Sequence, residues 1–414
     1  MSNDLVRVIG GPQNYAWGKL GSNSSVARFA HASDPQNVII DESLPYAEYW
    51  MGTHPKVPTI LSTNGEKLSD LISSNPEKYL SKSIMEKFNL KNSLPFLFKV
   101  LSIEKVLSIQ SHPDKKLAEQ LRLKDPEHYP DDNHKPEMAI AITDFEAFCG
   151  FKPLETIKDH LLNIKEFSSL IGDETTQIFI NNPSKENLKL VFSKVMYSND
   201  DDLIKYSNSL VSKAKENPSL YGETLSDLIL RLNDQFPNDI GLFCGCLMLN
   251  HCILKTGEAM FLQACEPHAY ISGDIIECMA ASDNVIRSGF TPKFKDVETL
   301  ISSLTYSTNN VDEQKLNPTN FERGNGDAIF NLYDPPIDEF SVLQVKFDKK
   351  GKANCKGING PSIIIVTEGN GIISNNDENK LDVFTGAVFF VAPNVELNIE
   401  TNDSLVLYRA YCEA

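Results

Sequence analysis

The sequence of 414 residues lacks the features that would direct it to a membrane or to nucleic acid. No apolar run approaches the roughly 20 residues that cross a bilayer. The opening sequence, MSNDLVRVIGGPQNYAWG, has neither the basic start nor the apolar stretch of a signal peptide. Basic residues number only 39 against 56 acidic ones, which gives a formal net charge of −17. We therefore expect a cytoplasmic protein with no nucleic-acid or membrane partner, because such partners require a dominant basic field.

Cysteine is sparse, and its spacing offers no sign of pairing. The eight cysteines are spread along the chain, and none forms a Cys-x-x-Cys motif. Without a secretory signal, this pattern predicts reduced and mostly buried thiols. Histidine is equally scarce, with eight residues and none beyond His268. A histidine-ligated metal site would therefore lie in the earlier part of the chain, and the C-terminal region could not supply one.

The hydrophobic pattern changes twice along the chain. Up to about residue 153, short apolar runs broken by Gly, Pro, Asn and Asp indicate strands, with one helical stretch, LSDLISSNPEKYLSKSIMEKF. Apolar residues then recur at helical spacing as far as about residue 239. Strand character resumes at Leu242. Near the C-terminus, SIIIVTEGNGIIS predicts a hairpin around Gly369–Gly371.

These changes predict a mainly β fold with a helical insertion. The length suggests two or three domains, and 41% hydrophobic residues suffice for a sizeable core. The predicted segments are 1–153 (first part of a β domain), 154–239 (helical insertion), 240–306 (second part of the β domain), 307–335 (linker) and 336–414 (C-terminal β domain without metal ligands).

Two stretches place possible metal ligands on strand faces. Ser108, Gln110 and His112 alternate at the end of an apolar strand, so their side chains should point the same way. In the sequence HKPEMAIAIT, Lys135 and Glu137 share one face of the predicted strand, and the histidine before them points away. Lys135 should therefore lie close to any metal that Glu137 binds.

A third stretch, GEAMFLQACEPHAYISGD, places His268 and Tyr270 on one face. Two imidazoles, a carboxylate and an amide oxygen form a plausible ligand set for zinc, and also for iron or manganese. Each pair alone is more often a hydrogen-bonded surface pair, so spacing leaves the metal site an open hypothesis. The candidate ligands are Gln110, His112, Glu137 and His268.

Several long motifs resemble one known family. LPFLFKVLSIEKVLSIQSHPDK, DDNHKPEMAIAITDFEAFCGF and GEAMFLQACEPHAYISGDIIECMAASDNVIRSGFTPKFKDV resemble the type I phosphomannose isomerases, and the fungal members most closely. QNYAWGKLGSNS near the start and PPIDEFSVL near the end extend the resemblance over essentially the whole chain. The resemblance implies two cupin β-barrels with a helical domain inserted into the first, and a single Zn²⁺ ion per chain.

The resemblance also assigns roles to individual residues. The family's zinc ligands correspond to the same four candidates, Gln110, His112, Glu137 and His268. Its catalytic arginine corresponds to Arg287, and its candidates for proton transfer to Glu277 and Lys135. Ser108 and Lys293 correspond to residues near the substrate phosphate.

Other site residues are inferred from spacing and residue type. Asp283 and Arg287 are four residues apart and would share a strand face, so Asp283 could pair with Arg287 and orient it. A structural ion pair is the alternative. Lys99 lies within the motifs and would add to a basic pocket in an acidic protein. Trp17 and Tyr270 would pack against the sugar, although core packing explains Trp17 equally well.

The reaction that the resemblance implies is an aldose–ketose isomerisation. Mannose 6-phosphate and fructose 6-phosphate interconvert through ring opening and a cis-enediol, which requires a polarised carbonyl, a base and a phosphate anchor. The expected partner is a small sugar phosphate, the expected oligomeric state is a monomer, and the expected role is mannose activation for GDP-mannose and protein glycosylation.

Two other hypotheses remain: a different enzyme on the same barrel, of which there are two candidates, and a catalytically silent binding protein. A non-haem iron oxygenase would present two histidines and one carboxylate with open positions, and the additional Gln110 and the basic residues argue against it. A metal-dependent glucose-6-phosphate isomerase would use the same barrel. A silent sugar-phosphate-binding protein would have lost the proton-transfer residues, yet Lys135, Glu277 and Arg287 are all present.

Overall fold

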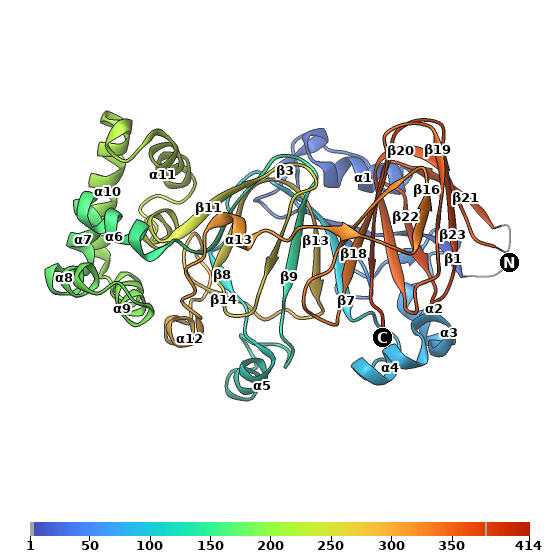
Figure 1. Ribbon diagram of the computed structural model, residues 1–414, viewed down its shortest axis with the longest axis horizontal. Helices are drawn as coiled ribbons and strands as arrows, with labels where there is room; N and C mark the ends of the chain where they lie inside the picture. The colour runs from blue at the N-terminus through green and yellow to red at the C-terminus, as the bar shows by residue number, and fades with distance from the viewer. Residues whose placement is uncertain (1–3, 377–378) are drawn as a thin grey trace.

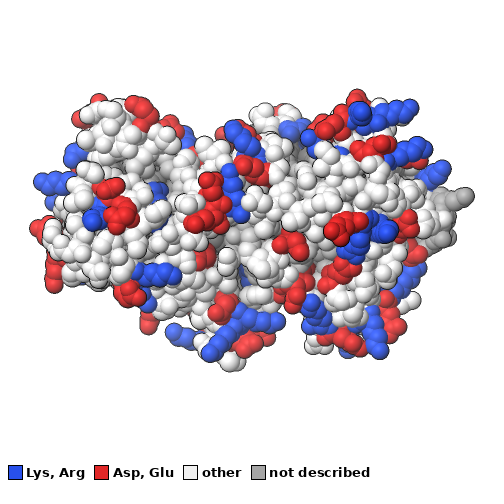
Figure 2. Space-filling view, in the orientation of Figure 1, with Lys and Arg blue, Asp and Glu red and all other residues white. Residues whose placement is uncertain are grey.

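The computed structural model describes residues 4–376 and 379–414. Three bodies lie in a row in Figure 1: a group of helices, a first β-barrel in the middle, and a second β-barrel at the other end. The predicted fold class, mainly β with a helical insertion, is confirmed. Acidic and basic side chains are interspersed over the face seen in Figure 2, without a continuous basic area.

The first barrel is built from a ten-stranded antiparallel sheet centred on β13. Strands β3 (Lys19–Leu20) and β4 (Pro45–Tyr46) form a separate two-stranded sheet. The strands of the ten-stranded sheet are β2 (Gly11–Gln13), β5 (Glu48–Met51), β7 (Phe96–Ile103), β8 (Gln110–Ser111), β9 (Glu137–Ala141), β10 (Phe145–Phe151), β11 (Leu249–Leu254), β12 (Ala259–Leu262), β13 (His268–Ala280) and β14 (Ile286–Arg287).

Strand β13 changes partners along its length, and this change positions the site. Residues 268–272 pair with β8 and β10, whereas residues 273–280 pair with β7 and β9. Gly273 lies at the change with a φ of 110°, and a Cβ there would lie 2.4 Å from the carbonyl oxygen of Asp144. Only glycine fits this conformation and this close approach. Side chains from both parts of β13 therefore face one interior.

The second barrel has a twelve-stranded sheet. Its strands are β1 (Leu5–Ile9), β6 (Ile60–Leu61), β15 (Thr319–Asn320), β16 (Gly324–Gly326), β17 (Ile329–Tyr333), β18 (Ser341–Phe347), β19 (Gly351–Cys355), β20 (Ser362–Ser374), β21 (Lys380–Phe384), β22 (Val388–Val391), β23 (Leu397–Thr401) and β24 (Leu405–Tyr411).

The predicted hairpin around Gly369–Gly371 is wrong, because SIIIVTEGNGIIS forms the single strand β20. The strand pairs with β22 and β24 in its first part and with β21 and β23 in its second. A bulge near Val366 and the φ of 85° at Gly369 let the chain bend between the two sets of partners. The glycines therefore mark a change of partner, as Gly273 does in β13.

Three segments lie in a different sheet from the one that the sequence suggested. Strands β1 and β6, expected in the first β domain, belong to the sheet of the second barrel: β1 pairs with β22, so that Leu5 lies opposite Val391, and β6 pairs with β1. The expected linker 307–335 contributes β15, β16 and β17 to the second barrel. Strands β15 and β16 are short and polar, so their pairing depends on distant partners rather than on a local hydrophobic pattern.

The helical group occupies the end of the molecule opposite the second barrel (Figure 1). Its apolar faces pack into one core with Phe148 and Phe151 of the first barrel. Strand character was expected from Leu242, but Leu242–Leu247 forms a fully buried π-helical turn and β11 begins at Leu249. A short apolar run buried on all sides does not distinguish helix from strand. The group comprises α6 (Leu154–Asn163), α7 (Lys165–Ile171), α8 (Asp173–Asn181), α9 (Lys185–Met196), α10 (Asp200–Glu216) and α11 (Glu223–Gln235).

The remaining helices cover the barrels. No helix in the described part of the chain is long and apolar enough to span a membrane. All eight cysteines are buried and free, as predicted. The covering helices are α1 (Ser25–Ser33), α2 (Leu68–Ser74), α3 (Pro76–Leu80), α4 (Lys82–Phe88), α5 (Lys115–Lys124), α12 (Val297–Ser303) and α13 (Val311–Gln314).

Candidate metal centre and active site

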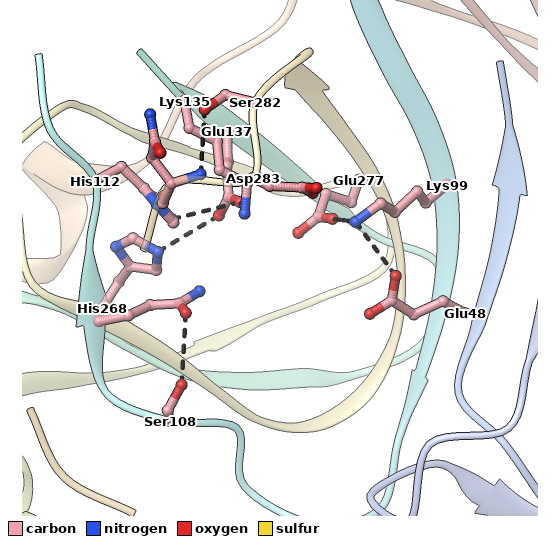
Figure 3. Close-up of polar contacts among 12 residues, drawn as sticks. Glu48, Lys99, Ser108, His112, Lys135, Glu137, His268, Glu277, Ser282 and Asp283 are labelled. Atoms are coloured by element: carbon pink, nitrogen blue, oxygen red, sulfur yellow. Dashed lines mark hydrogen bonds and ion pairs between the residues drawn. The ribbon is translucent and has the colours of Figure 1, made fainter. Parts of the chain in front are cut away.

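Two histidines and one glutamate converge inside the first barrel (Figure 3). His112 follows β8, Glu137 begins β9, and His268 begins β13. The Nε2 atom of His112 lies 3.5 Å from Oε1 of Glu137, and Nε2 of His268 lies 3.4 Å from Oε2. The three side chains are at most 2% exposed, and their possible ligand atoms all lie within 4.8 Å of one another.

Backbone carbonyls fix the orientation of both imidazoles. Nδ1 of His112 donates to the carbonyl oxygen of Asn284 at 2.7 Å, and Nδ1 of His268 donates to that of Glu266 at 3.0 Å. Each ring therefore turns its Nε2 toward the other members of the cluster, which is the arrangement found around metal-binding histidines.

The inner atoms of the cluster show that a metal fits there. Among the described residues, Nε2 of His112, Nε2 of His268 and Oε2 of Glu137 are buried without a hydrogen-bond partner. Such orphaned polar atoms are costly unless a ligand satisfies them. Burial lowers the pKa of His112 to about 4, so the ring is neutral and able to coordinate a cation. Two imidazoles and a carboxylate are a donor set suited to zinc.

Lys135 lies beside the cluster, as the strand alternation predicted. Its Nζ is 2.9 Å from Oε1 of Glu137. Burial by itself would raise the pKa of Glu137, but the positive charge of Lys135 and contact with His112 hold it well below its usual range. Glu137 is therefore ionised and ready to bind a cation.

Gln110 lies between a cluster residue and Arg287. On one side it is opposite His268 in the β8–β13 pair, and on the other it is opposite Arg287 in the β8–β14 pair. Residues directly opposite one another point to the same face of a sheet, so the three side chains form a row. The Ser108 hydroxyl donates to Oε1 of Gln110 at 3.5 Å. Metal binding by Gln110 stays a prediction.

Arg287 is half-buried, and burial lowers its pKa. Among the described residues, no carboxylate forms an ion pair with it, whereas Lys135 and Lys99 are both paired. A guanidinium that is partly desolvated and unpaired is suited to a ligand's anionic group.

Lys99 lies between two carboxylates, which corrects the prediction that it contributes to an open basic pocket. Its Nζ is 3.1 Å from Oε2 of Glu277, directly opposite on β13, and 3.2 Å from Oε2 of Glu48 on β5 (Figure 3). Trp50 also donates from Nε1 to Oε2 of Glu48 at 2.5 Å, and Lys99 lies over its ring. A phosphate would have to compete with both carboxylates.

Glu48 and Trp50 were missed in the sequence. Glu48 is a charged residue in the short run AEYWM, which the structure buries on both faces, and this conflict was the available signal. Local sequence could not show that Lys99, on the neighbouring strand β7, would neutralise it.

The carboxyl of Glu277 is only 3% exposed, and its burial raises its pKa even with Lys99 beside it. Burial by itself would lower the pKa of Lys99, but the negative charges of Glu48 and Glu277 raise this pKa overall. The hydroxyl of Tyr270 is buried without a hydrogen-bond partner among the described residues. Burial and the charges of Glu277 and Glu137 raise the pKa of Tyr270 well above its usual range.

The predicted pair between Asp283 and Arg287 is wrong. Asp283 lies 2.9 Å from Lys56 and 3.6 Å from His54, and these contacts hold its pKa well below the usual range. Residues 281–285 form an irregular loop tied to Asp131 rather than a strand, so strand alternation does not extend across them.

Lys293 and Trp17 lie apart from the cluster's direct contacts. Lys293 is exposed in the loop after β14. Trp17 packs with Tyr270 in one apolar cluster and stacks on Tyr15 at 5.9 Å between ring centroids. Trp17 therefore has the packing role that the sequence allowed as an alternative, and contact of Trp17 or Tyr270 with a sugar stays a prediction.

Two β-barrels, one of which encloses a buried cluster of two histidines and a carboxylate, define a protein of the cupin class with a candidate metal centre. Three family models match the chain: phosphomannose isomerase type I, catalytic domain (residues 5–154), helical insertion domain (167–249) and C-terminal (331–377). The chain is 60% identical to mannose-6-phosphate isomerase of Ogataea parapolymorpha over 99% of both chains, and 54% identical to that of Saccharomyces cerevisiae over 100% of both.

A solved structure gives the same result. Mannose 6-phosphate isomerase from Salmonella typhimurium, bound to fructose 6-phosphate and zinc, matches with a TM-score of 0.83 and 27% identity, covering 99% of this chain and 100% of that one. The chain therefore belongs to the type I phosphomannose isomerase family and is an isomerase.

Proposed function

We propose that the protein interconverts mannose 6-phosphate and fructose 6-phosphate, with zinc held by Gln110, His112, Glu137 and His268. One arrangement supports this proposal: the inner nitrogen and oxygen atoms of the histidine–glutamate cluster lack hydrogen-bond partners among the described residues, and Arg287, which no described carboxylate pairs with, lies two strands from His268. The cluster is suited to a cation and Arg287 to an anion. A sugar phosphate that reacts beside a metal requires both.

The reaction needs a proton to move between adjacent carbons. A base takes the C2 proton of open-chain mannose 6-phosphate, the C–H electrons form a C1–C2 double bond, and the aldehyde oxygen gains a proton to give the cis-enediol. Return of a proton to C1 and loss of one from the C2 hydroxyl give fructose 6-phosphate. Zinc, when bound, acts as a Lewis acid that stabilises negative charge on the substrate's oxygens.

Glu277 is the carboxyl best placed to move the carbon-bound proton. It is buried in the same interior as the cluster, and a raised pKa brings a carboxyl closer to the pH at which it both accepts and releases a proton. Lys99 keeps it oriented from the opposite strand. Lys135, held at Glu137, is the second donor, suited to protons on the sugar oxygens during ring opening.

The phosphate requires an anchor away from the reacting carbons, because its binding energy holds them in place. Arg287 provides a charge that no described carboxylate pairs with, and Ser108, just before β8, bonds to Gln110, the residue opposite Arg287. Lys293, on the loop after β14, would reach the phosphate from outside. Lys99 and Asp283 are engaged elsewhere and have supporting roles in this scheme.

Several finer points belong to the same proposal. The protein carries one zinc ion per chain, acts as a cytoplasmic monomer, and supplies mannose 6-phosphate for GDP-mannose and protein glycosylation. The predicted segment boundaries, adjusted for β1 and β15–β17, divide the chain into a catalytic barrel, a helical insertion and a C-terminal barrel.

The proposal is tested by a coupled assay for fructose 6-phosphate formation from mannose 6-phosphate, before and after treatment with a chelator. We expect conversion that the chelator abolishes and added zinc restores. Conversion that survives complete removal of metal would contradict the metal's role. No conversion by the zinc-loaded protein would contradict the proposed reaction.

A further inference from the structure

A buried carboxylate of the second barrel, that of Glu339, contacts the segment that carries the candidate metal ligand Glu137. Glu339 lies between β17 and β18 of that barrel and is 7% exposed. Its Oε1 accepts a hydrogen bond from Nε2 of His134 at 2.6 Å, although 205 residues separate the two in sequence. Burial would raise the pKa of Glu339, but the bond from His134 lowers it overall, so the carboxylate is charged.

His134 opens the short segment that carries Lys135 and Glu137. The proline after Lys135 restricts that lysine to an extended backbone, so neighbouring side chains leave the segment on opposite sides. His134 accordingly contacts the second barrel, whereas Lys135 contacts Glu137 in the first. A restraint on the His134 ring therefore also restrains the backbone from which Lys135 projects.

Among the residues that the structure describes, few polar contacts hold this segment from the side of the second barrel. A cavity of about 890 Å³ is lined by His134 and Glu339, and another of about 560 Å³ is lined by Asn133 and Glu339. The preceding residues are irregular and are held by Ser282 and Asn284, which bond to Asp131 and to the carbonyl of Asn133. Beyond Asn133, the backbone N–H of Ala280 donates to the carbonyl of Pro136 at 3.1 Å. Among the described residues, the bond between His134 and Glu339 is the polar contact that ties this segment to the second barrel.

We propose that Glu339 is a positioning residue for the active site, and that through His134 it gives the second barrel a direct part in orienting Lys135. This role rests on the proposed function of Lys135 in proton transfer. It also assigns a purpose to the sequence PPIDEF, whose acidic residue reaches across the interface between the barrels.

The test compares Glu339→Ala with Asp338→Asn. Asp338 is the neighbouring residue and pairs with Lys87 of α4 at 3.0 Å, but its side chain is 71% exposed and does not contact His134. The control therefore removes a different ion pair from the same segment and leaves the bond to His134 in place. Both variants are assayed as full-length, zinc-loaded protein for kcat, KM and zinc content, and for hydrogen exchange in the segment 131–137.

We expect Glu339→Ala to increase exchange in this segment and to lower kcat by about tenfold, the lower end of the range for outer-shell partners. KM and zinc content should change little, and Asp338→Asn should resemble the wild type. Because both residues act through one bond, His134→Ala should match Glu339→Ala, and the double variant should be no worse than either.

Exchange and kcat that are unchanged in Glu339→Ala would overturn the proposal, as would an equal loss in Asp338→Asn. If Glu339→Ala fails to fold, His134→Ala tests the same bond from the other barrel with the same outcomes. If the wild type itself does not isomerise mannose 6-phosphate, the proposed function fails, and hydrogen exchange still decides whether Glu339 holds the segment.

Discussion

Gln110 lies directly opposite Arg287 across the antiparallel pair of β8 and β14, so both side chains leave the same face of the sheet. The pairing places an unpaired cation one strand from a candidate metal ligand. Metal binding and anion binding can therefore be separated by mutation, because Arg287 is not one of the residues of the histidine–glutamate cluster.

Arg287→Ala should lower kcat/KM by about a hundredfold or more, the effect of removing one charged stabiliser from a preorganised site. Zinc content should not change, because no member of the cluster contacts Arg287. Steady-state kinetics and elemental analysis of the same preparation test this prediction. Arg287→Lys is the matched control and should recover part of the activity. Full turnover by Arg287→Ala would rule out its role.

His268→Ala should lose zinc and activity together, because it removes one of two imidazoles from a buried cluster. A bound metal stabilises the folded state by mass action, so a chelator should lower the melting temperature of the wild type and not that of the variant. His31→Ala removes an exposed histidine that bonds only to the carbonyl of Val38, and it serves as the control. Retention of zinc by His268→Ala would show that the metal lies elsewhere.

Lys99→Met should destabilise the protein by about 3–5 kcal/mol, because it leaves Glu48 and Glu277 buried without their shared cation. Urea denaturation gives the free energy of unfolding directly. Adding Glu48→Gln to Lys99→Met removes one of the two uncompensated charges and should restore part of this loss. A single variant as stable as the wild type would show that the ion pairs contribute nothing to stability.

Glu146 should make the attachment of the helical group sensitive to acid. Its carboxylate accepts bonds from Arg231 of α11 and from His251 and Ser272 of the first barrel. Burial would raise the pKa of Glu146, but His251 and Arg231 lower it to about 2, from an ordinary value of 4.5.

At a pH between the folded pKa of about 2 and the ordinary value of 4.5, Glu146 carries more protons in the unfolded chain than in the folded protein. The stabilisation from Glu146 is therefore present above about pH 4.5 and is lost as the pH falls toward 2. Unfolding free energies of the wild type and of Glu146→Gln, measured across this range, should converge at low pH. A constant difference between the two would contradict the prediction.

Much of the fold followed from local patterns. Helical spacing identified the region that forms α6–α11, and alternation together with turn residues identified β7, β9 and β10. The same alternation placed Lys135 beside Glu137, which the 2.9 Å contact confirms. Patterns of this kind are reliable because the side chains of a strand or helix repeat with a fixed period whatever the rest of the chain does.

Local patterns failed wherever the partner was distant. The glycines in SIIIVTEGNGIIS suggested a turn, but β20 continues because its two parts meet different strands. Alternation was extended through residues 281–285 and wrongly paired Asp283 with Arg287, since that loop is held by Asp131 instead. In both cases a long-range contact determined the local conformation.

The sequence by itself determined the family, the β-barrel class, the position of the helical insertion and the residue types of a metal site, because these are carried by motifs and by short-range periodicity. Only the tertiary structure decided that β1 joins the second barrel, that two carboxylates enclose Lys99, and that Glu339 bonds to His134. The physical reason is that an ion pair or a strand pairing depends on distance in space, and a sequence specifies that distance only once the whole chain has packed.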